Sequence, residues 1–462
     1  MATSKQPKRN VEGRERSRGA WIVIAIAVVL GACVGVVWWK GNSSDRTLEA
    51  RRAGDSATYP AELTPAEQER ALRAEQLRTV EQLVAAFPRS DDAVYLLGLV
   101  HNEQGDTASA MKFWQRSLEI DPSRADANDS LGNALLLRDE YEKAEEYFRK
   151  ALAIDPGLAT ANAHLASTLI HQGKMREAAA ILEKPQSLNA EAHRLLGEAY
   201  QNLGEFEKAR ASYLKAVALN SDLTEGYYGL SKVLNRLGER EQADKYFQTF
   251  SVLRERADER GRQVRADYNT MAITKKSVAQ THTDVGRVYV KEGRVREAET
   301  LWLKAAELDP KNSLCRLQLA VVYQQTGRHR EALKHYEEIA MADPNDALVQ
   351  LNMGRVWVKL NDMERAEQAF QQAIRLAPDQ PESHSSLAEL YLQARRNLAE
   401  AVALAETAVK LAPEAKYYAL LGQAYAMSND RAGALAAFNR AIDLQPDNHQ
   451  YVQFRKMLLE KP

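Results

Sequence analysis

The chain has 462 residues, of which 45% are hydrophobic and 27% charged, a balance typical of folded rather than disordered protein. Lys and Arg together number 62 and Asp and Glu 63, so net charge gives no reason to expect a nucleic-acid partner. The only cysteines, Cys33 and Cys315, exclude a disulfide framework and leave the redox compartment open.

The first predicted element is an apolar helix at residues 19–39. These 21 residues carry no charge, and as a helix they would span about 31 Å, the thickness of a bilayer core. The apolar part of a cleavable signal peptide usually has only about 7–15 residues. Trp21 near one end and Trp38–Trp39 at the other favour a retained transmembrane helix. Because Leu30–Cys33 reads LGAC, a lipoprotein and a cleaved signal stay open as alternatives.

Basic residues predict how this helix would be oriented. Residues 1–18 form a basic tail with six Lys or Arg, against four in residues 40–52. The positive-inside rule then places the N-terminus in the cytoplasm and the rest of the chain outside. The sequence thus predicts a single-pass membrane protein with a linker at residues 40–62. Its main domain would be extracytoplasmic, and periplasmic in a two-membrane bacterium.

A second helix is predicted within residues 63–90. The sequence TPAE at residues 64–67 supplies a Thr N-cap, Pro at the first helical position and Glu at the third, which together form a capping box. This helix would cover the first of the repeats that follow.

The rest of the chain is dominated by an internal repeat. Segments such as LGEAYQNLGE at Leu196 and LGQAYAMSND at Leu421 recur, mostly at intervals of 34 residues. A small residue marks the same place in each of ten units: Gly98, Gly132, Ala166, Gly197, Ser231, Gly286, Ala320, Gly354, Ala388 and Gly422.

Each unit reads as two helices, and the sixth shows why. Gly286 and Tyr289 fall on one face of a first helix, which Gly293 ends as a left-handed residue would. Trp302 lies on a second helix, which Pro310 stops because proline has no N–H and disfavours a helical residue before it. The glycine and the alanines of the unit are small where the helices cross, which should let the helix backbones approach, and Trp302 should fill the space between units.

Ten such units resemble the tetratricopeptide repeat family. The resemblance implies an all-α superhelical solenoid, in which each pair buries its apolar faces against its neighbours. Repeats 1–5 would occupy residues 91–257 and repeats 6–10 residues 279–448. A capping helix at 449–462 follows, where Tyr451, Phe454 and Leu458 share one face.

Three departures from the period are expected to have structural consequences. Repeat 3 is short and contains Pro185, so its second helix should end early. An extra residue before Ala401 should be absorbed in a turn. Residues 258–278 form a charged connector, after a helix that should run past Arg254. The connector is interpreted as a solvated helix and loop, or alternatively as a hinge or partner contact between two half-arrays.

No catalytic motif is found in the sequence. It lacks the phosphate-binding loop, the dinucleotide-binding glycines and the metalloprotease and hydrolase motifs. His164 and His171 could share a helix face but are interpreted as ordinary solenoid residues, and Cys315 as a small buried hydrophobe. We therefore predict no enzyme activity, no cofactor, no metal and no small-molecule substrate. Eight aromatic residues should lie in the core between helices: Trp114, Phe148, Tyr213, Phe247, Trp302, Tyr336, Phe370 and Phe438.

The family resemblance implies a binding site on the concave face, which the first helix of each unit lines. Six cations on that face would attract an acidic or carboxylate-terminated segment, and amides could contact a peptide backbone. The alternative is that these Lys and Arg residues are ordinary solvent-exposed positions of the helices and bind nothing. The predicted site comprises Lys232, Asn235, Arg236, Arg287, Lys291, Asn352, Arg355 and Lys359.

Two comparisons within the family limit the functional prediction. Leu99, Asn133 and Ser167 occupy the places where chaperone-tail-binding members carry a carboxylate clamp, so that clamp is absent. The asparagine ladder of the sugar-transferase members is also missing. The predicted function is a membrane-anchored scaffold or adaptor for protein–protein interaction, with an assembly or chaperone-like role. The alternative is an accessory or regulatory subunit of an enzyme encoded elsewhere.

Overall fold

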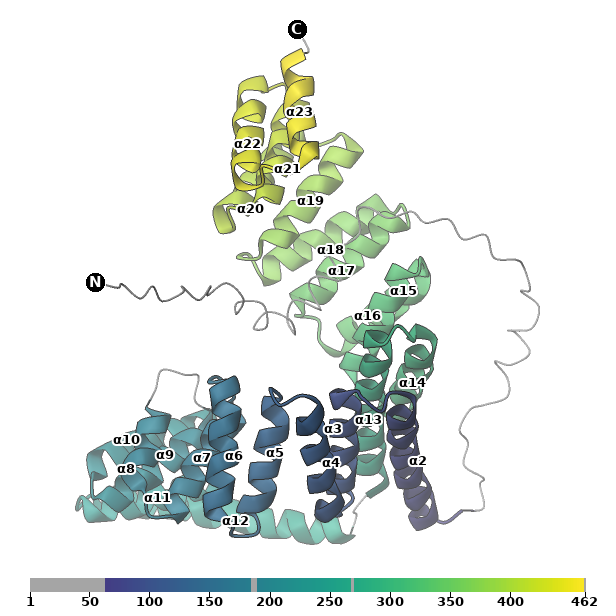
Figure 1. The fold of residues 1–462 in the computed structure, drawn as a ribbon. Coiled ribbons are helices and arrows are strands. Elements are labelled where there is room, and N and C mark those ends of the chain that lie inside the picture. The colour runs from purple at the N-terminus through teal and green to yellow at the C-terminus, as the bar shows by residue number, and fades with distance from the viewer. Residues whose placement is uncertain (1–62, 184–188, 267–269, 461–462) are drawn as a thin grey trace, which may run out of the picture. The chain divides into compact units, whose positions relative to one another are not determined.

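The computed structural model describes residues 63–183, 189–266 and 270–460. These ranges contain 22 helices and no strand (Figure 1). The all-helical class and the repeated helical pairs predicted from the sequence are confirmed.

The first half of the array begins with α2 (Pro65–Ala86), whose capping box at Thr64 and Glu67 is present. Repeats 1–5 follow as α3 (Asp91–Glu103), α4 (Thr107–Ile120), α5 (Ala125–Leu136), α6 (Tyr141–Ile154), α7 (Ala159–His171), α8 (Met175–Leu182), α9 (Ala190–Leu203), α10 (Phe206–Leu219), α11 (Thr224–Arg236) and α12 (Arg240–Ala266).

The second half has the same paired organisation. Repeats 6–10 are α13 (Thr270–Lys291), α14 (Val295–Leu308), α15 (Ser313–Gln325), α16 (His329–Ala342), α17 (Ala347–Lys359), α18 (Met363–Leu376), α19 (Pro381–Ala394), α20 (Leu398–Leu411), α21 (Ala415–Met427) and α22 (Arg431–Leu444). The last helix is α23 (His449–Glu460), where Tyr451, Phe454 and Leu458 pack against the cluster around Phe438.

In the six repeats whose marked residue is glycine, an aromatic side chain on the second helix packs against that glycine on the first. A Cβ atom added to Gly286 would lie only 2.3 Å from Trp302 Nε1, so a larger residue would collide there. Trp302 is fully buried, and its indole N–H donates to the carbonyl oxygen of Thr283 at 3.0 Å. This contact explains the recurrence of small residues at the marked positions.

The first helices of adjacent repeats lie closer together than the second helices. α5 contacts α7, α7 contacts α9, and α19 contacts both α17 and α21, whereas second helices of adjacent repeats touch marginally or not at all. The first helices therefore form the inner face of the array, and the second helices form the outer face.

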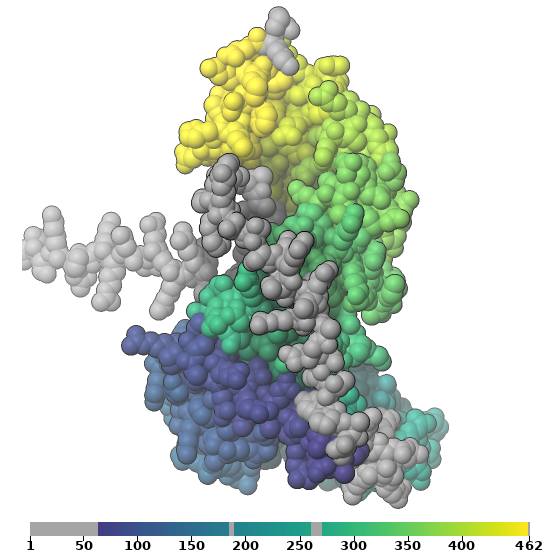
Figure 2. Space-filling model, turned by 90° about the vertical axis from the view of Figure 1, so that its right-hand side faces the viewer, coloured from purple at the N-terminus to yellow at the C-terminus, as the bar shows by residue number. Residues whose placement is uncertain are grey.

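Repeat 6 does not stack on repeat 5. The second helix of repeat 5, α12, has 27 residues in all and continues beyond Arg254 to Ala266 (Figure 1). α13 then packs against α2 and α3 at the opposite end of the first half-array. In Figure 2 the purple surface of the N-terminal helices accordingly adjoins the green surface of the second half-array. Most of the predicted connector is thus helical, as the end of α12 and the start of α13.

Two smaller departures follow the sequence. α8 has only 8 residues, which confirms that the second helix of repeat 3 ends early. The extra residue of repeat 9 is absorbed in the turn between α19 and α20, where Arg395 and Asn397 adopt positive φ angles of 48° and 51°.

The predicted membrane topology is contradicted. In the part of the chain that the structure describes, no helix is both long and apolar enough to cross a bilayer. The long helices there, α2, α12 and α13, carry charged residues along their length, so no apolar stretch of sufficient length occurs. The expected single-pass membrane location, with a cytoplasmic N-terminus and an extracytoplasmic array, is therefore corrected. Residues 19–39, the segment of the predicted anchor, lie outside the described residues.

Candidate functional site: the inner face and the joint between two half-arrays

An apolar core joins the two half-arrays. Val80 and Leu83 of α2 pack with Val285 and Val288 of α13, and each of the four is at most 6% exposed. Phe87 meets Tyr289 edge to face, with ring centroids 5.8 Å apart. α13 thus pairs with α2 on one flank and with α14 on the other. We call this contact of α2, α3 and α13 the joint.

Polar contacts flank this core. The side-chain amide of Gln76 on α2 donates to Thr281 Oγ1 at 2.9 Å and to Ser277 Oγ at 3.0 Å. Lys304 on α14 lies 3.3 Å from the carboxylate of Glu75. These hydrogen bonds connect residues about 200 positions apart in the sequence. They favour the pairing of α2 with α13 over other apolar contacts, because another pairing would leave these polar groups without partners.

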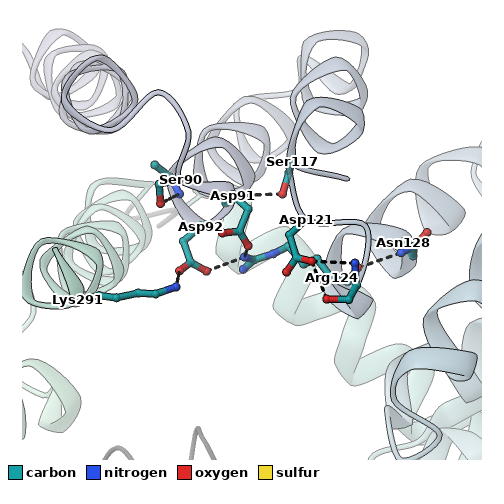
Figure 3. A network of polar contacts seen from close by, with 10 residues as sticks. Ser90, Asp91, Asp92, Ser117, Asp121, Arg124, Asn128 and Lys291 are labelled. Carbon is teal, nitrogen blue, oxygen red and sulfur yellow. Dashed lines mark hydrogen bonds and ion pairs between the residues drawn. The ribbon is translucent and has the colours of Figure 1, made fainter. Parts of the chain in front are cut away.

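A carboxylate at the start of α3 also holds α13 in the joint, through an ion pair with Lys291. Asp92 is 7% exposed, and it accepts hydrogen bonds from Arg124 Nη1 and from Lys291 Nζ, both at 2.6 Å (Figure 3). Arg124 also reaches Asp91 at 2.6 Å. Burial by itself would raise the pKa of Asp92, but the hydrogen bonds from Lys291 and Arg124 outweigh it and lower the pKa. Lys291 is therefore committed to an intramolecular ion pair.

The joint also holds a buried histidine. His282 on α13 is fully buried, and neither ring nitrogen has a hydrogen-bond partner among the described residues. Burial lowers its pKa to about 4, against a smaller opposing effect of Glu75, while Lys304 lowers it further. The imidazole is neutral at physiological pH and acts there as a packing group.

The structure distributes the predicted site residues over three separate helices. Lys232, Asn235 and Arg236 are exposed on α11 at the end of the first half-array, and Lys232 lies 5.3 Å from the centre of the Tyr228 ring. Arg287 on α13 is exposed and pairs with Asp284 at 3.4 Å. α11 and α13 do not pack together, so these cations do not form one continuous patch.

The third group of predicted site residues lies on α17, and its members differ in solvent exposure. Asn352 is only 4% exposed, because it faces the packing interior rather than the inner surface. Lys359 is exposed, and Arg355 is half-buried. Among the described residues, Arg355 has no hydrogen-bond or ion-pair partner, which distinguishes it from Arg287 and Lys291.

The surroundings of Arg355 are polar and of mixed charge. Burial lowers the pKa of its guanidinium, while Glu389 and Glu382 on α19 oppose that effect. Glu389 is exposed, but the helices around it still remove part of its hydration. This partial desolvation raises the pKa of Glu389, and the positive charge of Arg355 opposes the increase. Nearby, the hydroxyl of Tyr417 on α21 donates to Glu382 Oε1 at 2.9 Å. We call Arg355, Glu389, Glu382 and Tyr417 the inner-face cluster.

Sequence reasoning missed both acids of this cluster. Glu389 directly follows the small residue Ala388, as Arg355 follows Gly354, so the repeat register places both at the same position of successive repeats. A search of the inner face for cations alone does not find Glu389. No set of three or more His, Cys, Asp or Glu side chains in the described ranges could hold a metal ion. His164, for example, pairs with Asp129 at 2.9 Å.

The helical pairs, their inner face and their small-residue contacts define a helical-repeat protein of the interaction-scaffold class. Family models described as tetratricopeptide repeat match more than half of the chain, and the chain belongs to that family. The matched residues are 91–157, 135–186, 190–223, 289–355, 325–390 and 415–448.

Individual relatives are distant. The chain is 23% identical over 209 residues to anaphase-promoting complex subunit 3 of Schizosaccharomyces pombe (strain 972 / ATCC 24843), covering 45% of this chain and 23% of that protein. It is thus similar to less than a quarter of that relative's length.

Solved structures also match the chain, all at low similarity. The APC/C hetero-tetramer Cut9–Hcn1 matches with 15% identity and a TM-score of 0.35, over 80% of this chain and 90% of that one. Yeast Tom70 matches with 17% identity and a TM-score of 0.34, over 80% and 95%. YrrB, a TPR protein with an unusual peptide-binding site, matches with 23% identity and a TM-score of 0.34, over 38% and 92%.

Proposed function

We propose that this protein is a scaffold without catalytic activity, which binds an extended segment of another protein along the first helices of repeats 8–10. The observation that carries the proposal is Arg355, an inner-face guanidinium that is half-buried and has no hydrogen-bond or ion-pair partner in the described structure. A partly desolvated guanidinium without a hydrogen bond is costly even beside Glu389 and Glu382, and a ligand acceptor would reduce that cost.

The inner-face cluster favours a particular ligand chemistry. Arg355 needs an acceptor, which a carboxylate or a backbone carbonyl supplies, whereas Glu389 needs a donor such as a backbone N–H or a lysine. An extended peptide offers both kinds of group along its backbone. A uniformly acidic segment would be repelled by Glu389 and Glu382, so we propose a segment that carries an acidic group beside donors.

Peptide selection on the full chain tests this proposal. Peptides selected from a random display library should bind the wild type, and Arg355→Glu should weaken them by about tenfold to a hundredfold, as expected for loss of a charged hydrogen bond. Lys410→Glu is the matched control, because Lys410 is an exposed cation without an ion pair on α20, a second helix of the same half-array.

Equal effects of the two substitutions would contradict the site. Co-purification from the source cell then distinguishes the two roles of such a scaffold. A single stoichiometric enzyme would make the chain an accessory subunit, and several unrelated clients would support an adaptor role.

A further inference from the structure

The end of the first half-array lacks the covering helix found elsewhere. Tyr213 shows the usual arrangement, because added Cβ atoms at Gly197 of its own repeat and Gly229 of the next would both lie within 2.8 Å of its ring. Repeats 1 and 10 are covered by α2 and α23. After repeat 5 no further repeat stacks, since α13 packs at the joint.

This missing neighbour exposes an aromatic group. Phe247 was expected in the core, but it is 48% exposed, whereas its counterparts in the other repeats, such as Trp302 and Phe370, are at most 3% exposed. Phe247 and Tyr228 both contact Phe250, with ring centroids 5.6 and 5.1 Å apart. An exposed aromatic group at the end of a solenoid indicates a surface that another chain covers.

The charges beside Phe247 indicate which chain that is. Phe247 belongs to a row of exposed residues spaced alternately by four and three positions, which places them on one flank of α12. None of the charged members has an ion pair among the described residues. The row comprises Arg240, Asp244, Phe247, Ser251, Arg254 and Asp258.

The order of this row is self-complementary. When a second α12 runs antiparallel across a two-fold axis at Thr249, position 240 faces 258, position 244 faces 254 and position 247 faces 251. Each arginine of the row then faces an aspartate, and each Phe247 ring faces a serine beside the second Phe247. A two-fold contact requires such self-complementarity, which an unrelated partner would not.

We propose that α12 is a self-association surface, on which a second copy of this chain binds antiparallel through the row from Arg240 to Asp258. The contact buries Phe247 and gives the four charges partners. It is independent of the inner-face cluster, which lies in the other half-array. Because the ion pairs are exposed, the dimer should weaken as ionic strength rises.

Sedimentation velocity on the full chain tests this proposal by charge reversal. Asp244→Arg and Arg254→Asp each turn two attractive pairs of the dimer into repulsive ones, so each should weaken dimerisation about tenfold or more. An equimolar mixture of the two variants should restore dimers, because Arg at position 244 of one chain then faces Asp at 254 of the other. The control is Gln242→Arg, on an exposed position of α12 away from the row, and it should dimerise as the wild type does.

Three results would overturn the proposal: a wild type that stays monomeric at about 100 µM, variants that dimerise like the wild type, or a mixture that fails to recover. Recovery in the mixture also excludes misfolding of the single variants as the cause of their loss.

Discussion

Truncating Val288 tests whether repeat 6 packs against α2. Val288 is 6% exposed within the apolar core of the joint, and Val290, two residues later on α13, is 37% exposed. Val288→Ala removes two buried methyl groups and should cost about 2 kcal/mol in the free energy that holds the joint closed. Val290→Ala should cost less than about 0.5 kcal/mol.

Hydrogen exchange measured by mass spectrometry locates this effect. A loss of about 2 kcal/mol should accelerate amide exchange roughly 30-fold where opening of the joint limits it. The acceleration should appear in α2, α3 and α13 and leave α19–α22 unchanged. Faster exchange in α11 and α12 instead of α2 would mean that repeat 6 stacks on repeat 5, and would refute the joint.

Three further predictions concern the joint, the repeat and the first helix. His282 has a pKa of about 4 in the folded chain and 6.5 unfolded, so the unfolded state binds more protons between these pH values. Stability should therefore fall by about 3 kcal/mol from pH 6.5 to pH 4, and His282→Leu should remove this part of the dependence in urea titrations. Gly354→Ala should destabilise repeat 8 by about 1–3 kcal/mol in thermal unfolding, because the new Cβ would lie 2.4 Å from the Phe370 ring. Thr64→Ala should cost about 1 kcal/mol and speed exchange at the start of α2, since it removes the capping box.

The repeat period predicted most of the fold because it records contacts between neighbours in sequence. Gly286 and Trp302 are 16 residues apart, so their packing follows from one unit alone. The joint could not be predicted in this way, because Gln76 and Thr281 are far apart in sequence and belong to no shared repeat. The assignment of Phe247 to the core was wrong for a related reason. Its exposure depends on where α13 packs, which the repeat period does not reveal.

The inner face was only partly predictable. The repeat register assigns Arg355 to the first helix of its repeat, but it does not distinguish Arg355 from Lys291, whose partner Asp92 comes from repeat 1. Asn352 was chosen for its amide, although its position in the helix turns it toward the packing interior. Side-chain type alone does not separate a ligand-binding cation from one that holds two parts of the chain together.

Photo-cross-linking of a selected peptide to the full chain tests the central claim most directly. A peptide carrying a photoreactive residue should form adducts on α17, α19 and α21, mapped by mass spectrometry, and Arg355→Glu should remove them. Adducts confined to the second helices or to repeats 1–5, or adducts that persist in Arg355→Glu, would contradict binding at the inner-face cluster.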